Sequence, residues 1–245
     1  MQSSHNRAKY KLALNMSWVS SFLTSSIGKK LIMSLTGIFL ILFITVHLVG
    51  NLQLLIPDGG VTFNLYAKLM TTNPIIQTIA IGNYIFILLH AIQGILLWRK
   101  NSAARGSKYA VKKVNAKSTS GFASSNMGWL GTIILVFILI HLYQFWLQMK
   151  MDVVPYVNIE GEEVKNLYFI VTEAFTNPIY SIFYMICMIV IAFHLWHGFQ
   201  SAFQTLGLNH KKYTPFIQGL GKIYSVVVPL GFAIIPLFFL LGMHS

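Results

Sequence analysis

Hydrophobic residues in this chain occur in five long runs that contain few polar side chains. An α-helix rises about 1.5 Å per residue, so roughly 20 apolar residues cross the hydrocarbon core of a bilayer. Each run reaches that length, and together they predict five transmembrane helices. The runs cover residues 31–56, 75–98, 128–149, 179–204 and 218–242.

The first four of these predicted helices repeat a pattern of glycine, proline and histidine. In both copies a glycine lies ten residues before a histidine, and an Asn-Pro step lies shortly before a second histidine with a glycine four residues later. We therefore predict an internal repeat of a two-helix unit. The first copy contains Gly37, His47, Pro74, His90 and Gly94, and the second contains Gly131, His141, Pro178, His194 and Gly198.

Composition agrees with a membrane location. Of 245 residues, 55% are hydrophobic and only 10% are charged, and the mean hydropathy is +0.64. A soluble core does not absorb that much apolar sequence, so we expect an all-α integral membrane protein.

Cys187 is the one cysteine and lies in an apolar run, which excludes disulfide frameworks and cysteine-ligated clusters. We expect a polar, basic N-terminal segment over 1–30 without a cleavable signal, and a transmembrane domain over 31–245.

The charged residues are divided between the two ends of the predicted helices. The positive-inside rule places the basic connections in the cytoplasm, so the N-terminus is expected in the cytoplasm and the C-terminus outside. The net charge of +12 then needs no nucleic acid, because lipid headgroups or a docked partner explain it. The expected cytoplasmic set is Arg7, Lys9, Lys11, Lys29, Lys30, Arg99, Lys100, Arg105, Lys108, Lys112, Lys113, Lys117, Lys211, Lys212 and Lys222. The opposite set is Lys68, Lys150, Lys165, Asp58, Asp152, Glu160, Glu162, Glu163 and Glu173.

Chain direction converts the histidine positions into depths. His47 and His141 come late in helices that run outward, whereas His90 and His194 come late in helices that run inward. Two imidazoles from different helices at each level predict the axial ligands of an outer and an inner haem b. Because glycine has no side chain, Gly94 and Gly198 would leave room for a flat haem beside their histidines.

Other interpretations of these residues remain open. Glycines in membrane helices often serve close helix packing, and a lone histidine can hydrogen-bond a carbonyl group. His197 competes with His194, but the repeat aligns it with Gln93, so we assign iron to His194. A non-haem metal site is disfavoured because no carboxylate or thiolate accompanies the histidines. His5, His210 and His244 lie in tails or a loop and carry no predicted role.

Four short motifs carry a resemblance to a known family. They are Leu35-Thr36-Gly37-Ile38-Phe39 running to His47, Leu89-His90-Ala91, His141-Leu142-Tyr143, and His194 running to Leu206-Gly207-Leu208. Their order and five-helix setting resemble the dihaem cytochrome b membrane-anchor subunit of succinate:quinone oxidoreductases, the succinate dehydrogenases and fumarate reductases. The resemblance covers nearly the whole chain from about Lys30 onward.

The resemblance implies a subunit of a respiratory-chain and tricarboxylic acid cycle enzyme in the inner (cytoplasmic) membrane. Partners would be a flavoprotein subunit with FAD and an iron–sulfur subunit, and this chain would carry no succinate-oxidising site and no catalytic residue. Electrons would pass between the iron–sulfur subunit and menaquinone or ubiquinone through two haem b groups. The family ligands match His47 and His141 for the outer haem and His90 and His194 for the inner haem. Some fumarate-reducing relatives carry an acid where this chain has Ala192, so a buried carboxylate proton path is not expected here.

A quinone needs hydrogen-bond partners beside a haem. Asn51, Gln144 and Gln148 lie three to seven residues after an outer histidine, on the face that an α-helix would share with it, and are candidates. An inner alternative uses Ser34, Gln93 and His197. Lys29, Lys30, Arg99 and Lys222 are candidates for the inner haem propionates, and Trp98 and Trp146 are expected to be interfacial anchors.

Two other functions stay open from the sequence. The chain could be the haem b anchor of a formate dehydrogenase or hydrogenase type of membrane oxidoreductase. It could also be a transporter that binds no haem.

Overall fold

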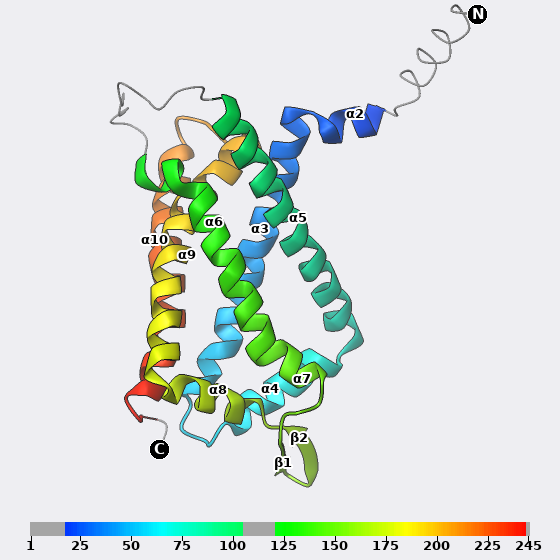
Figure 1. Cartoon of the computed structure of the whole chain (residues 1–245), viewed down its shortest axis with the longest axis vertical. Helices are drawn as coiled ribbons and strands as arrows, with labels where there is room; N and C mark the ends of the chain where they lie inside the picture. The colour runs from blue at the N-terminus through cyan, green and yellow to red at the C-terminus, as the bar shows by residue number, and fades with distance from the viewer. Residues whose placement is uncertain (1–17, 105–120, 244–245) are drawn as a thin grey trace, which may run out of the picture.

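The computed structural model describes residues 18–104 and 121–243, and five long helices dominate it (Figure 1). All five are long and apolar enough to cross a membrane, which confirms the predicted spans and a multi-pass membrane protein. The helices are α3 (Ser26–Asn51), α5 (Pro74–Ala104), α6 (Gly121–His141), α9 (Pro178–Thr205) and α10 (Thr214–Leu240). Two are extended, α3 by the 3₁₀ turn η1 (Leu52–Leu55) and α6 by the π-helical segment η2 (Leu142–Leu147) and α7 (Gln148–Lys150).

The helices begin earlier than the hydropathy pattern predicts. For example, α6 starts at Gly121 rather than at residue 128, because its first turns contain polar residues that continue the helix beyond the apolar run. Residues 18–30, expected as a segment outside the transmembrane domain, contain α2 (Trp18–Thr24) and the start of α3. The predictions for His5, Arg7, Lys9, Lys11, Arg105, Lys108, Lys112, Lys113, Lys117 and His244 fall outside the described residues.

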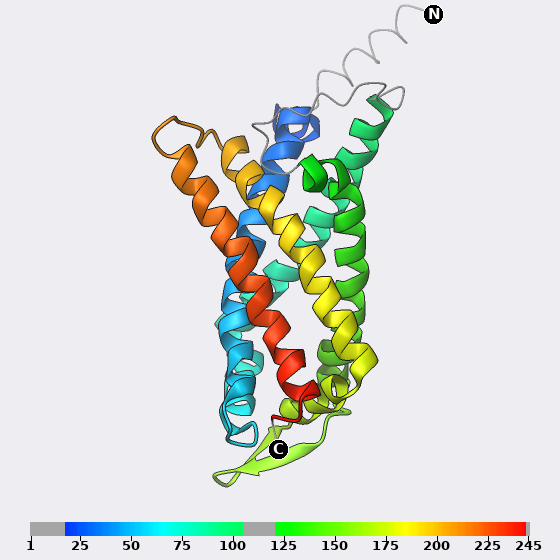
Figure 2. The same cartoon turned by 90° about the vertical axis from the view of Figure 1, so that its left-hand side faces the viewer.

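Four helices surround a central space, and the fifth packs against their outside. Helix α3 contacts α5 and α9, and α6 contacts the same two helices, so these four form a closed ring. Helix α10 packs against α9 and α3 (Figure 2). Many large apolar side chains on the outer faces are exposed, among them Leu88 at 60%, Leu139 at 60% and Ile186 at 55%. In a membrane such side chains face lipid rather than water.

Short elements close the end of the bundle opposite α2 (Figures 1 and 2). These are α4 (Val61–Thr72), α8 (Leu167–Thr176) and an antiparallel hairpin of β1 (Tyr156–Ile159) and β2 (Glu162–Lys165). A buried cluster that includes Leu54, Phe175, Cys187 and Phe239 joins α8, α9, α10 and η1 at this end. All six acidic residues lie on elements or connections of this end, whereas Lys29, Arg99 and Lys211 lie at the other.

The Asn-Pro step has the same local geometry at both of its occurrences. Oδ1 of Asn73 accepts hydrogen bonds from the backbone N–H groups of Ile75 and Ile76 at 3.0 and 3.2 Å. Oδ1 of Asn177 accepts from Ile179 and Tyr180 at 3.0 and 3.3 Å. Asparagine is a favoured N-cap, and proline fits the first helical turn because its missing donor would have no partner there. These caps start α5 and α9 immediately after α4 and α8 end.

Candidate functional site

A cavity of about 1570 Å³ extends between α3, α5, α6 and α9 and is lined by His47, His90, His141 and His194. Its wall also includes Lys30 at one end of the bundle and Lys150 at the other. Pockets for one small molecule usually measure roughly 300–1,000 Å³. The cavity therefore has room for more than one ligand of that size.

The histidines approach one another in the two pairs that the depth argument predicts. The ring centroids of His47 and His141 lie 5.9 Å apart, and those of His90 and His194 lie 6.3 Å apart. An imidazole nitrogen binds a transition metal at about 2 Å, so two imidazoles on opposite sides of one metal ion have ring centres roughly 6 Å apart. Both separations match that arrangement.

Hydroxyl groups contact Nδ1 in one histidine of each pair. Oγ1 of Thr36 lies 3.1 Å from Nδ1 of His90, and it donates its own hydrogen to the Ile32 carbonyl at 2.8 Å. It can therefore accept the Nδ1–H. The Tyr184 hydroxyl lies 3.3 Å from Nδ1 of His141. Histidines that bind a metal through one ring nitrogen usually donate the N–H of the other to such a group.

The other two histidines differ in their surroundings. The Asn51 amide lies 3.2 Å from Nδ1 of His47 and donates to the His47 carbonyl oxygen at 2.7 Å. Phe43 stacks on the His47 ring at 5.3 Å. The buried Nδ1 of His194 has no hydrogen-bond partner among the described residues. That nitrogen is left for a group that the described part of the protein does not provide.

Two glycines of the sequence repeat face histidines of the neighbouring helix. A Cβ placed on Gly37 would lie 3.3 Å from Cε1 of His90, and one on Gly131 would lie 3.8 Å from Cε1 of His194. Gly94 and Gly198 also line the cavity, as their proposed role beside a flat ligand requires. Gly50 is different, because a Cβ there would overlap the Tyr66 ring at 2.4 Å.

The π-helical turn of η2 changes which residues face the cavity after His141. An extra residue in the turn rotates the following positions, so the i+3 and i+7 spacing of a regular α-helix no longer applies. Phe145, Trp146 and Met149 line the cavity, whereas Gln144 and Gln148 are not among its lining residues. The side chain of Gln148 instead donates to the Tyr143 carbonyl at 3.3 Å.

The remaining quinone candidates differ in whether they line the cavity and in whether they already have a hydrogen-bond partner. Asn51 lines the cavity but is held by His47. In the inner set, Ser34 donates to the Ala202 carbonyl at 2.7 Å and so joins α3 to α9. His197 lines the cavity, while Gln93 is not among the lining residues. The Oε1 atom of Gln93 is buried and has no hydrogen-bond partner in the described part of the chain.

Several cavity residues were not predicted from the sequence. Asn83 is 4% exposed and lines the cavity, and its Oδ1 has no hydrogen-bond partner within residues 18–104 and 121–243. It lies seven residues before His90, which is two helical turns or about 10 Å along α5. A polar amide two turns before His90, on the same face of an apolar helix, is the signal that could have identified it. Trp98 and Trp146, expected as interfacial anchors, both line the cavity.

Fewer basic residues line the cavity than the sequence analysis proposed as propionate partners. Of the propionate candidates Lys29, Lys30, Arg99 and Lys222, the cavity wall includes Lys30. Lys100, which was not a candidate, donates to Oγ of Ser26 at 2.6 Å.

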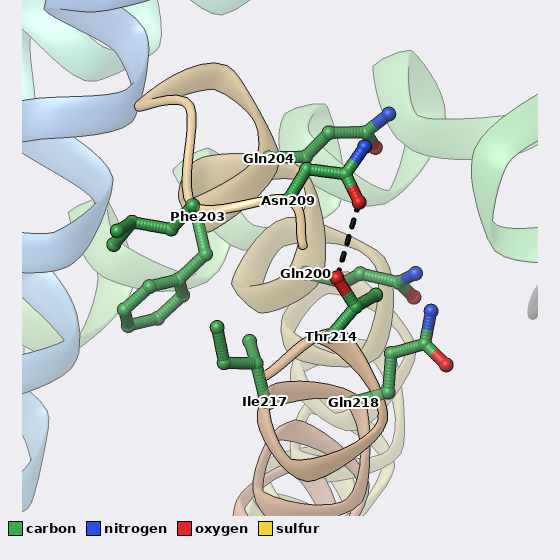
Figure 3. Close-up of a pocket in the computed structure, with 8 residues that line it drawn as sticks. Gln200, Phe203, Gln204, Asn209, Thr214, Ile217 and Gln218 are labelled. Carbon is green, nitrogen blue, oxygen red and sulfur yellow. Dashed lines mark hydrogen bonds between the residues drawn. The ribbon is translucent and has the colours of Figure 1, made fainter. Parts of the chain in front are cut away.

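A second, smaller hollow of about 130 Å³ lies where α9 and α10 are joined (Figure 3). Gln200, Gln204 and Gln218 line it, and Oγ1 of Thr214 donates to Oδ1 of Asn209 at 3.1 Å. Its lining contains no histidine and no acidic or basic residue. It is therefore a polar loop contact rather than part of the histidine site.

Searches against protein-family models, curated proteins and solved structures found no match to this chain.

Proposed function

We propose that this chain is the dihaem cytochrome b membrane anchor of a succinate:quinone oxidoreductase, with its basic end in the cytoplasm. The observation that carries the proposal is the pairing of four imidazoles from four helices in one cavity. Each pair has the ring separation that two axial ligands of one metal require. The resemblance of the four histidine motifs supplies the enzyme class.

The donor set suits haem better than a bare metal ion. Among the described residues, no three His, Cys, Asp or Glu side chains converge on one point. A protein site for a metal ion alone usually needs three or more such ligands. A porphyrin supplies four nitrogen ligands itself, so two histidines complete the coordination of its iron. The bound haem would supply one-electron transfer across the membrane.

The protein's own residues would orient and isolate these groups. Thr36 and Tyr184 would accept the Nδ1–H of His90 and His141, which would leave Nε2 of each ring for a metal. Phe137, Phe145 and Tyr184 surround His141 and exclude water from the outer pair. Such orientation and burial set the basicity of the ligands and thereby the potential of the metal.

The partners follow from the proposed enzyme class. A flavoprotein and an iron–sulfur subunit would dock at the cytoplasmic end, and a quinone would exchange electrons with the membrane part. The structure offers Asn51 among the outer candidates, and Ser34 and His197 among the inner ones, as polar side chains on the cavity wall.

Donor-specific reduction tests this function. Native membranes that contain the protein are supplied with succinate, formate or hydrogen, and the haem absorbance is followed. We expect succinate to reduce the haem and the specific inhibitor malonate to block that reduction. Reduction by formate or hydrogen, with no response to succinate, would assign the chain to another oxidoreductase. A protein that purifies without haem would contradict a cytochrome altogether.

A further inference from the structure

Helix α2 leaves the bundle at a fixed angle. Oγ of Ser25 accepts a hydrogen bond from the N–H of Gly28 at 3.0 Å and donates to the Phe22 carbonyl at 2.6 Å, so one side chain joins the end of α2 to the start of α3. A Cβ on Gly28 would lie 2.0 Å from the Phe22 carbonyl oxygen. Only glycine permits this close approach, and α2 consequently runs across the direction of the long helices (Figure 1).

The short helix separates apolar from polar side chains. With 3.6 residues per turn, Trp18, Phe22 and Leu23 fall on one half of its surface, while Ser20, Ser21 and Thr24 fall on the other. Trp18 is 79% exposed, and Phe22 and Leu23 are 38% and 43% exposed, so the bundle leaves much of the apolar half uncovered. Exposed tryptophan and phenylalanine on one side of a helix require some apolar environment.

The lipid-facing surface of α3 indicates which environment this is. Leu35, which is 53% exposed, and Val49, which is 63% exposed, lie on the outside of α3 and are not among the residues that line the cavity. These residues share one face by helical periodicity and belong to a helix that can span a membrane. Helix α2 is therefore joined directly to a helix whose exposed apolar face would contact lipid.

We propose that α2 lies in the headgroup region of the bilayer, with Trp18, Phe22 and Leu23 directed into the lipid. Amphipathic helices with tryptophan bind membranes in this orientation, and tryptophan is enriched at the membrane–water boundary. Lys29 and Lys30 follow within the next two turns and attract anionic headgroups. The elbow at Ser25 and Gly28 holds the helix parallel to the membrane surface. This role does not depend on haem binding.

Site-directed spin labelling of the full chain in vesicles of phosphatidylethanolamine and phosphatidylglycerol tests the proposal. Trp18→Cys samples the apolar half and Ser21→Cys is the matched control on the polar half. The buried Cys187 is 3% exposed, and the labelled parent chain measures its background. Because oxygen concentrates in lipid and nickel chelates stay in water, we expect the oxygen-to-nickel accessibility ratio to be at least about threefold higher at residue 18 than at residue 21.

Two results would overturn the proposal. Equal accessibility ratios at the two positions would show that α2 lies in water. Protection of residue 18 from the nickel chelate that appears only after soluble subunits are added would assign the apolar half to a protein partner. A second label pair, Phe22→Cys and Thr24→Cys, repeats the comparison one turn further along.

Discussion

Single hydroxyl groups set the orientation of the imidazoles in this cavity. Thr36 is 4% exposed and places Oγ1 between Nδ1 of His90 and the carbonyl of Ile32. Its contribution is a hydrogen bond to the ring nitrogen that would not bind metal. Mutation of a hydrogen-bond partner of this kind often lowers metal affinity by about 10–100-fold.

Replacement of Thr36 by valine therefore has a specific expected result. Thr36→Val keeps the shape of the side chain but removes the hydroxyl group that contacts Nδ1 of His90. We expect haem retention at the His90–His194 pair to fall by roughly tenfold or more, and the potential of that haem to change, while the other haem stays as in the parent. The haem-to-protein ratio and a redox titration measure both effects.

Thr132→Val is the matched control. The Thr132 hydroxyl donates to the Gly128 carbonyl at 2.8 Å in α6, and Thr132 also lines the cavity. If the two valine variants lose haem equally, the hydroxyl of Thr36 has no special role at His90.

The glycines of the repeat provide a second residue-scale prediction. Gly37→Ala would place a methyl group 3.3 Å from Cε1 of His90, tighter than an ordinary contact, so the ring must shift by a few tenths of an ångström. Gly131→Ala would place it 3.8 Å from Cε1 of His194, which is an ordinary contact. We expect Gly37→Ala to alter the low-temperature spectrum of one haem and Gly131→Ala to leave the spectrum unchanged. A changed spectrum for Gly131→Ala together with an unchanged spectrum for Gly37→Ala would contradict the packing described for these glycines.

At the scale of elements, the sequence predicts the five spans and both Asn-Pro helix starts. Apolar length and N-capping are local properties, which explains why they can be recognised without a structure. The register after His141 could not be predicted, because the π-helical turn depends on packing that the sequence pattern does not reveal. That turn replaces Gln144 and Gln148 with Phe145, Trp146 and Met149 on the cavity wall.

The two capping asparagines should contribute equally to stability. Asn73→Ala and Asn177→Ala each remove a side-chain oxygen that accepts hydrogen bonds from two N–H groups at a helix start. We expect each substitution to lower the free energy of unfolding by about 1 kcal/mol. Thermal unfolding in detergent measures the loss.

Asn126→Ala is the control for these caps. The Asn126 side chain donates to the Phe122 carbonyl within α6 and caps no helix start. A loss at residue 126 as large as that at residue 177 would show that the caps are not the source of the effect.

Across the whole molecule, polar groups close the end that carries the acidic residues. Lys68 of α4 forms an ion pair with Glu162 of β2, and Lys165 of β2 forms one with Asp152 at 2.8 Å. The Tyr156 hydroxyl of β1 also donates to Asp152 at 2.7 Å. Lys165 and Tyr156 hold the pKa of Asp152 below its ordinary value of 3.8. Lys68 holds the pKa of Glu162 below its ordinary value of 4.5.

These shifts give the hairpin a defined dependence on pH. Because both carboxyl pKa values are lowered in the folded protein, the stabilisation is present above pH 4.5 and is lost as the pH falls below the two ordinary values. We expect hydrogen exchange in β1 and β2 to accelerate below that range while exchange in α9 stays slow. Glu162→Gln should remove part of the pH dependence. An unchanged profile would show that these ion pairs do not hold the hairpin.

The two paired sites also belong to the molecule as a whole, because each joins helices that are distant in sequence. His47 and His141 connect α3 to α6, and His90 and His194 connect α5 to α9. The sequence predicts these pairs because chain direction converts position into depth. It does not predict Asn83, Thr36 or Tyr184, whose roles depend on how the helices are rotated.

The most direct test is the haem content of the purified chain and of its four histidine variants. Extraction and reduced-minus-oxidised spectra should give two haem b groups in the parent chain. His47→Ala or His141→Ala should remove one haem, and His90→Ala or His194→Ala should remove the other. A colourless parent chain, or variants that each keep both haems, would contradict the proposed pairing.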